Sequence, residues 1–139
     1  MTSGFTLLEV LIALLIFSFG LLALAALMAK GLQYNTSALH RSYASSQAYD
    51  IADRVRANRN EDYTVTSNAE PDQRCLTTGC DAAAMRDFDL RQWSDTNEAV
   101  LPEGSGTITG DASLYTITIT WDDDRDGQAD DSFEFTFRP

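Results

Sequence analysis

The hydrophobic pattern begins with one long apolar run near the start of the chain, from Phe5 to Ala29. Its only polar side chains are those of Thr6, Glu9 and Ser18. Leucine, alanine and methionine, which dominate the run, are strong helix formers. About 25 helical residues extend roughly 37 Å, enough to cross the hydrocarbon core of a bilayer. The run therefore predicts a transmembrane helix. It also places one carboxylate, that of Glu9, where a charge is costly and marks a functional site.

After Lys30 the spacing becomes that of an amphipathic helix. Apolar residues recur at intervals of three and four, which puts them on one helical face, with charged residues on the other. We expect one continuous helix, in which residues 5–29 form the transmembrane segment and residues 30–59 form an amphipathic segment packed on a domain. The apolar face comprises Ala44, Ala48, Ile51, Ala52 and Val55.

The remaining residues, 60–139, are predicted to form one small globular region. From Asn60 to Pro102 polar and small residues predominate, which indicates an irregular connecting segment. A short helix is expected within it, at residues 81–93. The side chains that this helix would bury are Met85, Phe88, Leu90 and Trp93.

Strand patterns follow near the C-terminus. In SLYTITITW, residues 113–121, apolar residues alternate with threonine, and in SFEFTF, residues 132–137, phenylalanine alternates with polar residues. We expect these segments to pair as an antiparallel hairpin whose apolar face lies on the amphipathic helix. SGTIT, residues 105–109, is a predicted third strand. The whole pattern predicts an α+β fold, in which a long N-terminal helix packs on a small antiparallel sheet.

The charge of the chain narrows the classes of function. It has 21 aspartates and glutamates against 10 lysines and arginines, a formal net charge of -11. An acidic surface repels phosphate backbones, so direct nucleic-acid binding is not expected. The single histidine, His40, has no second histidine near it, which argues against most metal-hydrolase and Ser-His designs, and we expect it on a helix surface. No nucleophile has a nearby base motif, so an enzyme is not expected.

The motif GFTLLEV, residues 4–10, followed by an uninterrupted apolar helix, resembles the class III signal of type IV prepilins and type II secretion pseudopilins. In these families a prepilin peptidase cuts between glycine and phenylalanine and methylates the new amine. The resemblance implies a leader of residues 1–4, cleavage between Gly4 and Phe5, and N-methylation of Phe5. Such leaders normally carry lysine or arginine, and residues 1–4 have neither. That departure predicts either an upstream start or less efficient processing.

The same resemblance gives Glu9 a role in assembly, because family members keep an acid at this place in the helix. After cleavage Phe5 would carry a free α-ammonium one helical turn from Glu9. The carboxylate would then pair with its own amine or, in a filament with residues 5–29 at its core, with that of the adjacent subunit. The alternative is that Glu9 lies close to the interface and reaches water without a specific role.

Cys75 and Cys80 are the only cysteines. Export across a bacterial inner membrane, which the resemblance implies, would place them in an oxidising compartment, where a disulfide is expected. A bridge closing so short a loop stabilises the fold by roughly 2 kcal/mol in the chain-entropy model. Free thiols are the alternative. A zinc site would need more ligands than two cysteines and one distant histidine.

Several segments after the apolar run resemble the PilV group of minor type IV pilins: the cysteine loop, YDI before ADRVRANR, DFDLRQW, LPEGSG and YTITITWDDD. This implies a low-abundance structural subunit that helps prime pilus assembly near the tip and so supports piliation, twitching motility and adhesion. The implied partners are other minor pilins, the major pilin and the prepilin peptidase. The implied location is the inner membrane, with a periplasmic C-terminal domain, and then the surface pilus. The alternative is a minor pseudopilin of a type II secretion system.

The acidic segment DDDRDGQADD, residues 122–131, is expected at the tip of the hairpin. Asp122, Asp124 and Asp126 alternate ahead of Gly127, as at the start of a calcium-binding loop, where the glycine permits a sharp turn. The sequence therefore offers calcium as a possible ligand, and no other cofactor is expected. The alternative is a solvated acidic turn whose charges are screened by water and salt.

The closing ligand of this loop departs from the usual pattern. A bidentate glutamate is expected at the twelfth position, which here is Phe133. Glu134 lies one place beyond and, by strand alternation, on the opposite face. Asp130 or Asp131 would have to close a shorter loop instead.

Overall fold

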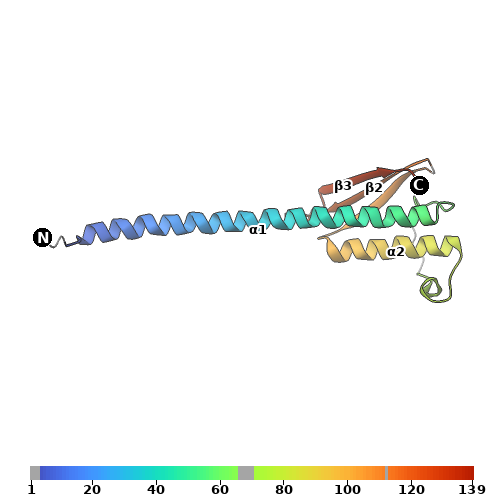
Figure 1. The fold of residues 1–139 in the computed structure, drawn as a ribbon, viewed down its shortest axis with the longest axis horizontal. Helices are drawn as coiled ribbons and strands as arrows, with labels where there is room; N and C mark the ends of the chain where they lie inside the picture. The colour runs from blue at the N-terminus through green and yellow to red at the C-terminus, as the bar shows by residue number, and fades with distance from the viewer. Residues whose placement is uncertain (1–3, 66–70, 112) are drawn as a thin grey trace. The chain divides into compact units, whose positions relative to one another are not determined.

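The computed structural model describes residues 4–65, 71–111 and 113–139. Within these described residues, two helices, one 3₁₀ turn and three strands follow one another (Figure 1). In order they are α1 (Leu7–Ala57), η1 (Gln73–Leu76), α2 (Ala82–Val100), β1 (Ser105–Asp111), β2 (Leu114–Trp121) and β3 (Asp131–Phe137). The chain divides into two compact units, Met1–Ala38 and Leu39–Pro139, and α1 contributes residues to both.

The first unit is helical from Leu7 onward, and its apolar side chains are exposed. The helix contains a window long and apolar enough to cross a membrane, with a mean hydropathy of 2.9, and none of that window is buried. Such a helix is typical of prepilins anchored in the inner membrane. The predicted apolar segment is therefore confirmed as one unbroken helix, which runs through the predicted boundary at residues 29 and 30.

In the second unit, α1 packs on a three-stranded antiparallel sheet with the order β1-β2-β3. The central strand β2 alternates as predicted, because its apolar side chains from Tyr115 to Trp121 are buried against the helix and its threonines lie on the other face. The helix contributes a stripe of apolar side chains, which the sheet and α2 cover completely. The buried apolar residues of α1 and β2 are Ala44, Ala48, Ile51, Ala52, Val55, Tyr115, Ile117, Ile119 and Trp121.

The register of the sheet is regular on both sides of β2. Ile108 of β1 lies opposite Ile117, and Phe135 of β3 lies opposite the same residue from the other side. The pairing of β2 with β3 runs without interruption from Tyr115 opposite Phe137 to Trp121 opposite Asp131. The predicted α+β fold and its three strands are confirmed.

Helix α2 is longer than the sequence pattern indicated. Residues 60–102 were expected to be irregular around a short helix, but α2 continues to Val100. Asp81 begins it by accepting a hydrogen bond from the Ala84 amide at 2.8 Å. Two of the four side chains expected in the core, Phe88 and Trp93, are buried, while Met85 and Leu90 are half-buried. Figure 1 shows α2 running beside the C-terminal part of α1.

Trp93 joins α1, α2 and β1 at one point. Its indole N–H donates to the Gln47 carbonyl of α1 at 3.0 Å. Its ring lies directly on Gly106 of β1, where any Cβ would overlap the indole. Gly106 is therefore required by the close approach of a neighbouring ring, and this contact sets the distance between α2 and the sheet.

Candidate functional site

The predicted processing segment lies just before α1. Gly4 and Phe5 are exposed and non-helical, and the Phe5 side chain is 83% exposed. Thr6 begins the helix, because its Oγ1 accepts a hydrogen bond from the Glu9 amide at 3.3 Å. The Gly4–Phe5 bond can therefore be reached without breaking helical hydrogen bonds.

Glu9 lies in the first turn of α1, where the helix dipole favours a negative charge. Phe5 and Glu9 line the same shallow groove, together with Ala13 and Phe17. The spacing Thr6-Leu-Leu-Glu9 also fits a capping box, of which the structure contains the threonine half. That signal was present in the sequence, and in the structure it uses the backbone amide of Glu9, so the carboxylate keeps only its predicted role in assembly.

Cys75 and Cys80 form a disulfide, as predicted, so the free-thiol alternative is wrong. The bridge joins Cys75, which lies within η1, to Cys80, and Asp72 begins η1 by accepting a hydrogen bond from the Arg74 amide. The Arg74 guanidinium pairs with the same carboxylate and holds the pKa of Asp72 below its usual value. Because Cys80 immediately precedes the capping residue Asp81, the bridge restrains the approach to α2.

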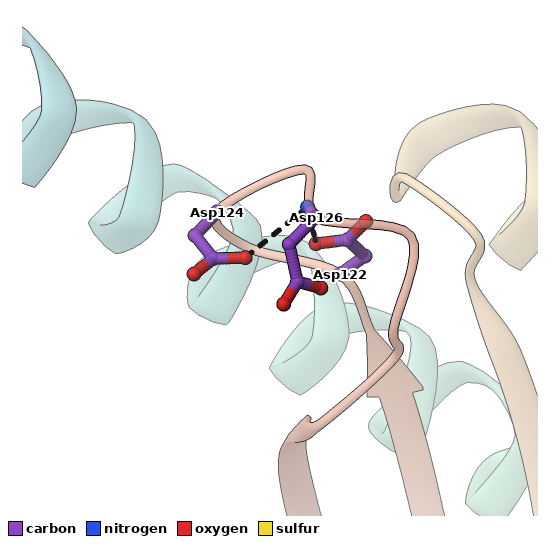
Figure 2. A group of neighbouring side chains, drawn as sticks. All are labelled: Asp122, Asp124 and Asp126. Atoms are coloured by element: carbon purple, nitrogen blue, oxygen red, sulfur yellow. Dashed lines mark hydrogen bonds between the residues drawn. The ribbon is translucent and has the colours of Figure 1, made fainter.

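The acidic segment forms the loop between β2 and β3, and its three predicted carboxylates come together there (Figure 2). One oxygen from each of Asp122, Asp124 and Asp126 lies within 4.8 Å of the others. Asp122 is buried and organises the loop, because its two oxygens accept hydrogen bonds from three backbone amides. One of these donors is the Gly127 amide, at 2.8 Å. Asp124 and Asp126 are exposed.

The charges of this loop repel one another. The neighbouring carboxylate of Asp126 raises the pKa of Asp124, and the more distant charges of Asp122 and Asp130 act in the same direction. Oxygen ligands and a positive φ of 86° at Gly127 suit a hard cation such as Ca²⁺. Convergence of the three carboxylates fits the start of such a site, and calcium binding stays a prediction.

The structure shows where the residues proposed to complete a calcium site in the β2–β3 loop lie. Glu134 is exposed on the face of β3 opposite Phe133, as predicted, and so does not close the loop. Asp131 is already paired with Arg41 of α1 at 3.0 Å. Asp130, the other aspartate proposed as a closing ligand, is exposed.

The expectation that His40 lies on the surface of a helix is wrong. Its side chain is buried, and its Nδ1 lies 2.8 Å from Oδ1 of Asp123, within the acidic loop. Trp121 also donates its indole N–H to that oxygen, at 3.3 Å. Together with the Arg41–Asp131 pair, this contact fastens both ends of the loop to α1. Local sequence patterns could not predict the contact between His40 and Asp123, because 83 residues separate these two residues in the chain.

A second polar cluster was also missed by the sequence analysis. Asp89 of α2 is buried, and it accepts hydrogen bonds from the Tyr63 hydroxyl at 2.8 Å and from Arg54 at 3.2 Å. Burial raises the pKa of Tyr63 well above its ordinary value, and the bond to Asp89 acts in the same direction. Asn58 donates to the Tyr63 oxygen at 3.2 Å. The cluster joins the end of α1 to α2 and to the connecting segment.

Comparison with known proteins gives one match. Residues 1–25 match the family model described as the prokaryotic N-terminal methylation motif. No curated protein and no solved structure matches the chain. The match covers the predicted leader and the start of α1, and so includes the predicted cleavage bond and Glu9.

Proposed function

We propose that this chain, a pilin-like protein by its N-terminal methylation motif, is a minor type IV pilin of the PilV group. In this role it is a structural subunit that helps prime pilus assembly near the tip and so supports piliation, twitching motility and adhesion. Its partners are other minor pilins, the major pilin and the prepilin peptidase. It resides in the inner membrane, with a periplasmic C-terminal domain, before it enters the pilus.

One observation supports this proposal most strongly: the helix that begins within the methylation motif continues without a break into the unit that holds the sheet. The methylation motif covers residues 1–25, and α1 runs unbroken from Leu7 to Ala57 into the unit that holds the sheet. An exposed apolar helix needs lipid or neighbouring subunits around it, because none of its apolar window is buried by the residues that the structure describes. Pilin-like proteins are typically non-enzymatic structural subunits, which agrees with the chemistry of the sequence.

We assign Glu9 the assembly role within this function. Cleavage before Phe5 creates a positive amine in the groove that Glu9 also lines. A carboxylate and an ammonium in an apolar environment attract each other strongly, because little water screens them. Docking of a neighbouring subunit's amine against Glu9 would set the register of the new subunit in the filament.

A minor pseudopilin of a type II secretion system is the competing function, since the methylation motif is common to both. The disulfide loop and the acidic β2–β3 loop support the pilus, because both are among the segments that resemble the PilV group. Deleting the gene and scoring surface pili against secreted enzymes separates the two. Loss of pili with normal secretion supports the proposal, whereas lost secretion with normal pili supports the pseudopilin.

Processing is tested independently of that choice. Co-expression with a prepilin peptidase should yield a chain that begins at a methylated Phe5, and mass spectrometry of the membrane form measures it. A chain that keeps its leader under these conditions, with the start of translation verified, would contradict the pilin assignment as a whole.

A further inference from the structure

The two edges of the sheet differ in how they are covered. At β1, Trp93 lies on Gly106, and Tyr63 and Thr64 of the connecting segment border the same strand around a cavity of about 340 Å³. At β3, no strand pairs with the outer edge among residues 4–65, 71–111 and 113–139. About half of the backbone N–H and C=O groups of β3 therefore point away from β2 without a partner strand.

The free edge of β3 has only part of the usual protection against pairing. Natural edge strands carry charged side chains, especially lysine, or proline or bulges that prevent another strand from adding. Asp131–Phe137 contains neither lysine nor proline, its register with β2 runs without a bulge, and its charged side chains are those of Asp131 and Glu134. Phenylalanine alternates with small or polar residues, which is the composition of a strand suited to pairing on both sides.

The side chains along this edge describe the strand that would fit. On the helix side Phe133 and Phe135 are only half-buried, and the Phe135 ring meets that of Tyr49 at 4.6 Å. Tyr49 itself is 52% exposed. An incoming strand would complete the burial of this aromatic row with apolar side chains at alternate positions. On the opposite face of β3, Glu134 stands between Ser132 and Thr136 as the single charged side chain.

Repulsion between like charges disfavours a second copy of this chain as the occupant of the β3 edge. Glu134 is the central residue of β3, so two copies of the strand paired antiparallel over their full length would place the two Glu134 side chains directly opposite each other. Like charges in that position destabilise the pair. A lysine or arginine opposite Glu134 would instead be attracted to its carboxylate.

We propose that the outer edge of β3 is a strand-addition site. It takes an extended segment of another protein that presents apolar side chains to Tyr49 and Phe135, and a basic side chain opposite Glu134. Backbone hydrogen bonds hold the segment, and the alternating side chains select it. This interaction surface goes beyond the role of the methylation motif and of Glu9.

The test uses the full chain in a neutral detergent and a short capped peptide that alternates valine with threonine and has one central lysine in the threonine row. Binding should slow hydrogen exchange of amides in residues 131–137. Replacing the peptide lysine by glutamate should weaken binding about fivefold, as expected for one cross-strand charge pair. Glu134→Lys should reverse this preference. Glu98→Lys, the same charge change at an exposed position on α2, should leave it unchanged.

Three results would overturn the proposal. In the first, no peptide protects β3, or protection appears at β1 instead. In the second, the lysine and glutamate peptides bind equally well, which removes the charge selection. In the third, the parent chain alone self-associates through β3, which makes a second copy the occupant. A peptide methylated on alternate amide nitrogens provides the control, because it keeps the side chains but cannot form the ladder.

Discussion

Replacing Tyr63 by phenylalanine removes one hydroxyl from the polar cluster around Asp89. Tyr63 is 1% exposed and donates to Asp89 at 2.8 Å, so water does not replace the lost bond. Asp89 keeps its bond from Arg54 at 3.2 Å, and Asn58 keeps its bond to the Ala82 carbonyl at 2.8 Å. The variant therefore weakens the cluster without leaving either neighbour wholly unpaired.

The expected loss of stability follows from the charge of the acceptor. A hydrogen bond to a charged group contributes roughly 1.5 to 3 kcal/mol, so we expect Tyr63→Phe to lower the free energy of unfolding by about 2 kcal/mol. For a unit of the size of Leu39–Pro139, this corresponds to a fall in Tm of roughly 10 °C. Near-UV circular dichroism of the full chain in detergent, recorded during heating, measures that fall.

Tyr49→Phe is the matched control, because it removes the same atom from a side chain that is 52% exposed. Its effect should lie within about 0.5 kcal/mol of zero. Equal shifts in Tm for Tyr63→Phe and Tyr49→Phe would refute the claim that the bond between Tyr63 and Asp89 stabilises the fold.

The same pair gives a prediction for pH. Because the folded-state pKa of Tyr63 is raised, the stability that it contributes is fully present below a pH of about 10 and is lost as the pH rises further. Tyr63→Phe lacks this loss, so the difference in stability between parent and variant should shrink above that pH. A difference that stays constant or grows would contradict the assigned direction.

Three further predictions concern the candidate sites. Glu9→Ala should insert into the inner membrane as the parent does but be depleted from sheared pili, and normal incorporation by immunoblot would exclude pairing with the amine. Non-reducing mass mapping should find Cys75 joined to Cys80, and a Cys75→Ser/Cys80→Ser variant should lose roughly 2 kcal/mol of stability; alkylation of both thiols in the periplasmic parent would contradict the bridge. Millimolar calcium should raise the Tm of the full chain relative to chelator, with no rise in Asp124→Ala, and an unchanged parent would eliminate the cation site.

The elements with a regular period were predictable from the sequence. The alternation from Tyr115 to Trp121 fixes which face of β2 is buried, and the spacing from Ala44 to Val55 fixes the buried face of α1. The end of α2 was not predictable in this way. Its last residues are mostly polar, and buried Asn97 gives no apolar signal there, so packing rather than local pattern extends the helix to Val100.

The candidate site, too, was predictable where its residues lie close together in the sequence and not where they are distant. Three features are each local in sequence: the processing motif, the cysteine pair and the aspartates of the loop. The spacing of their residues was therefore enough to recognise each of them. The partners of His40 and Asp89 are distant in the chain, and only the fold shows which charges meet. Hydrophobic periodicity is a local signal, so it cannot reveal a buried pair whose residues are far apart in the sequence.

The contact between Trp93 and Gly106 limits how related sequences can vary. A larger residue at position 106 has no room while the indole lies on the strand, and a smaller residue at position 93 leaves a cavity over the glycine. Substitutions at the two positions should therefore occur together, with alanine or serine at 106 accompanied by a narrower ring or an aliphatic side chain at 93. An alignment of homologous chains would then show these two sites as a covarying pair, although 13 positions separate them.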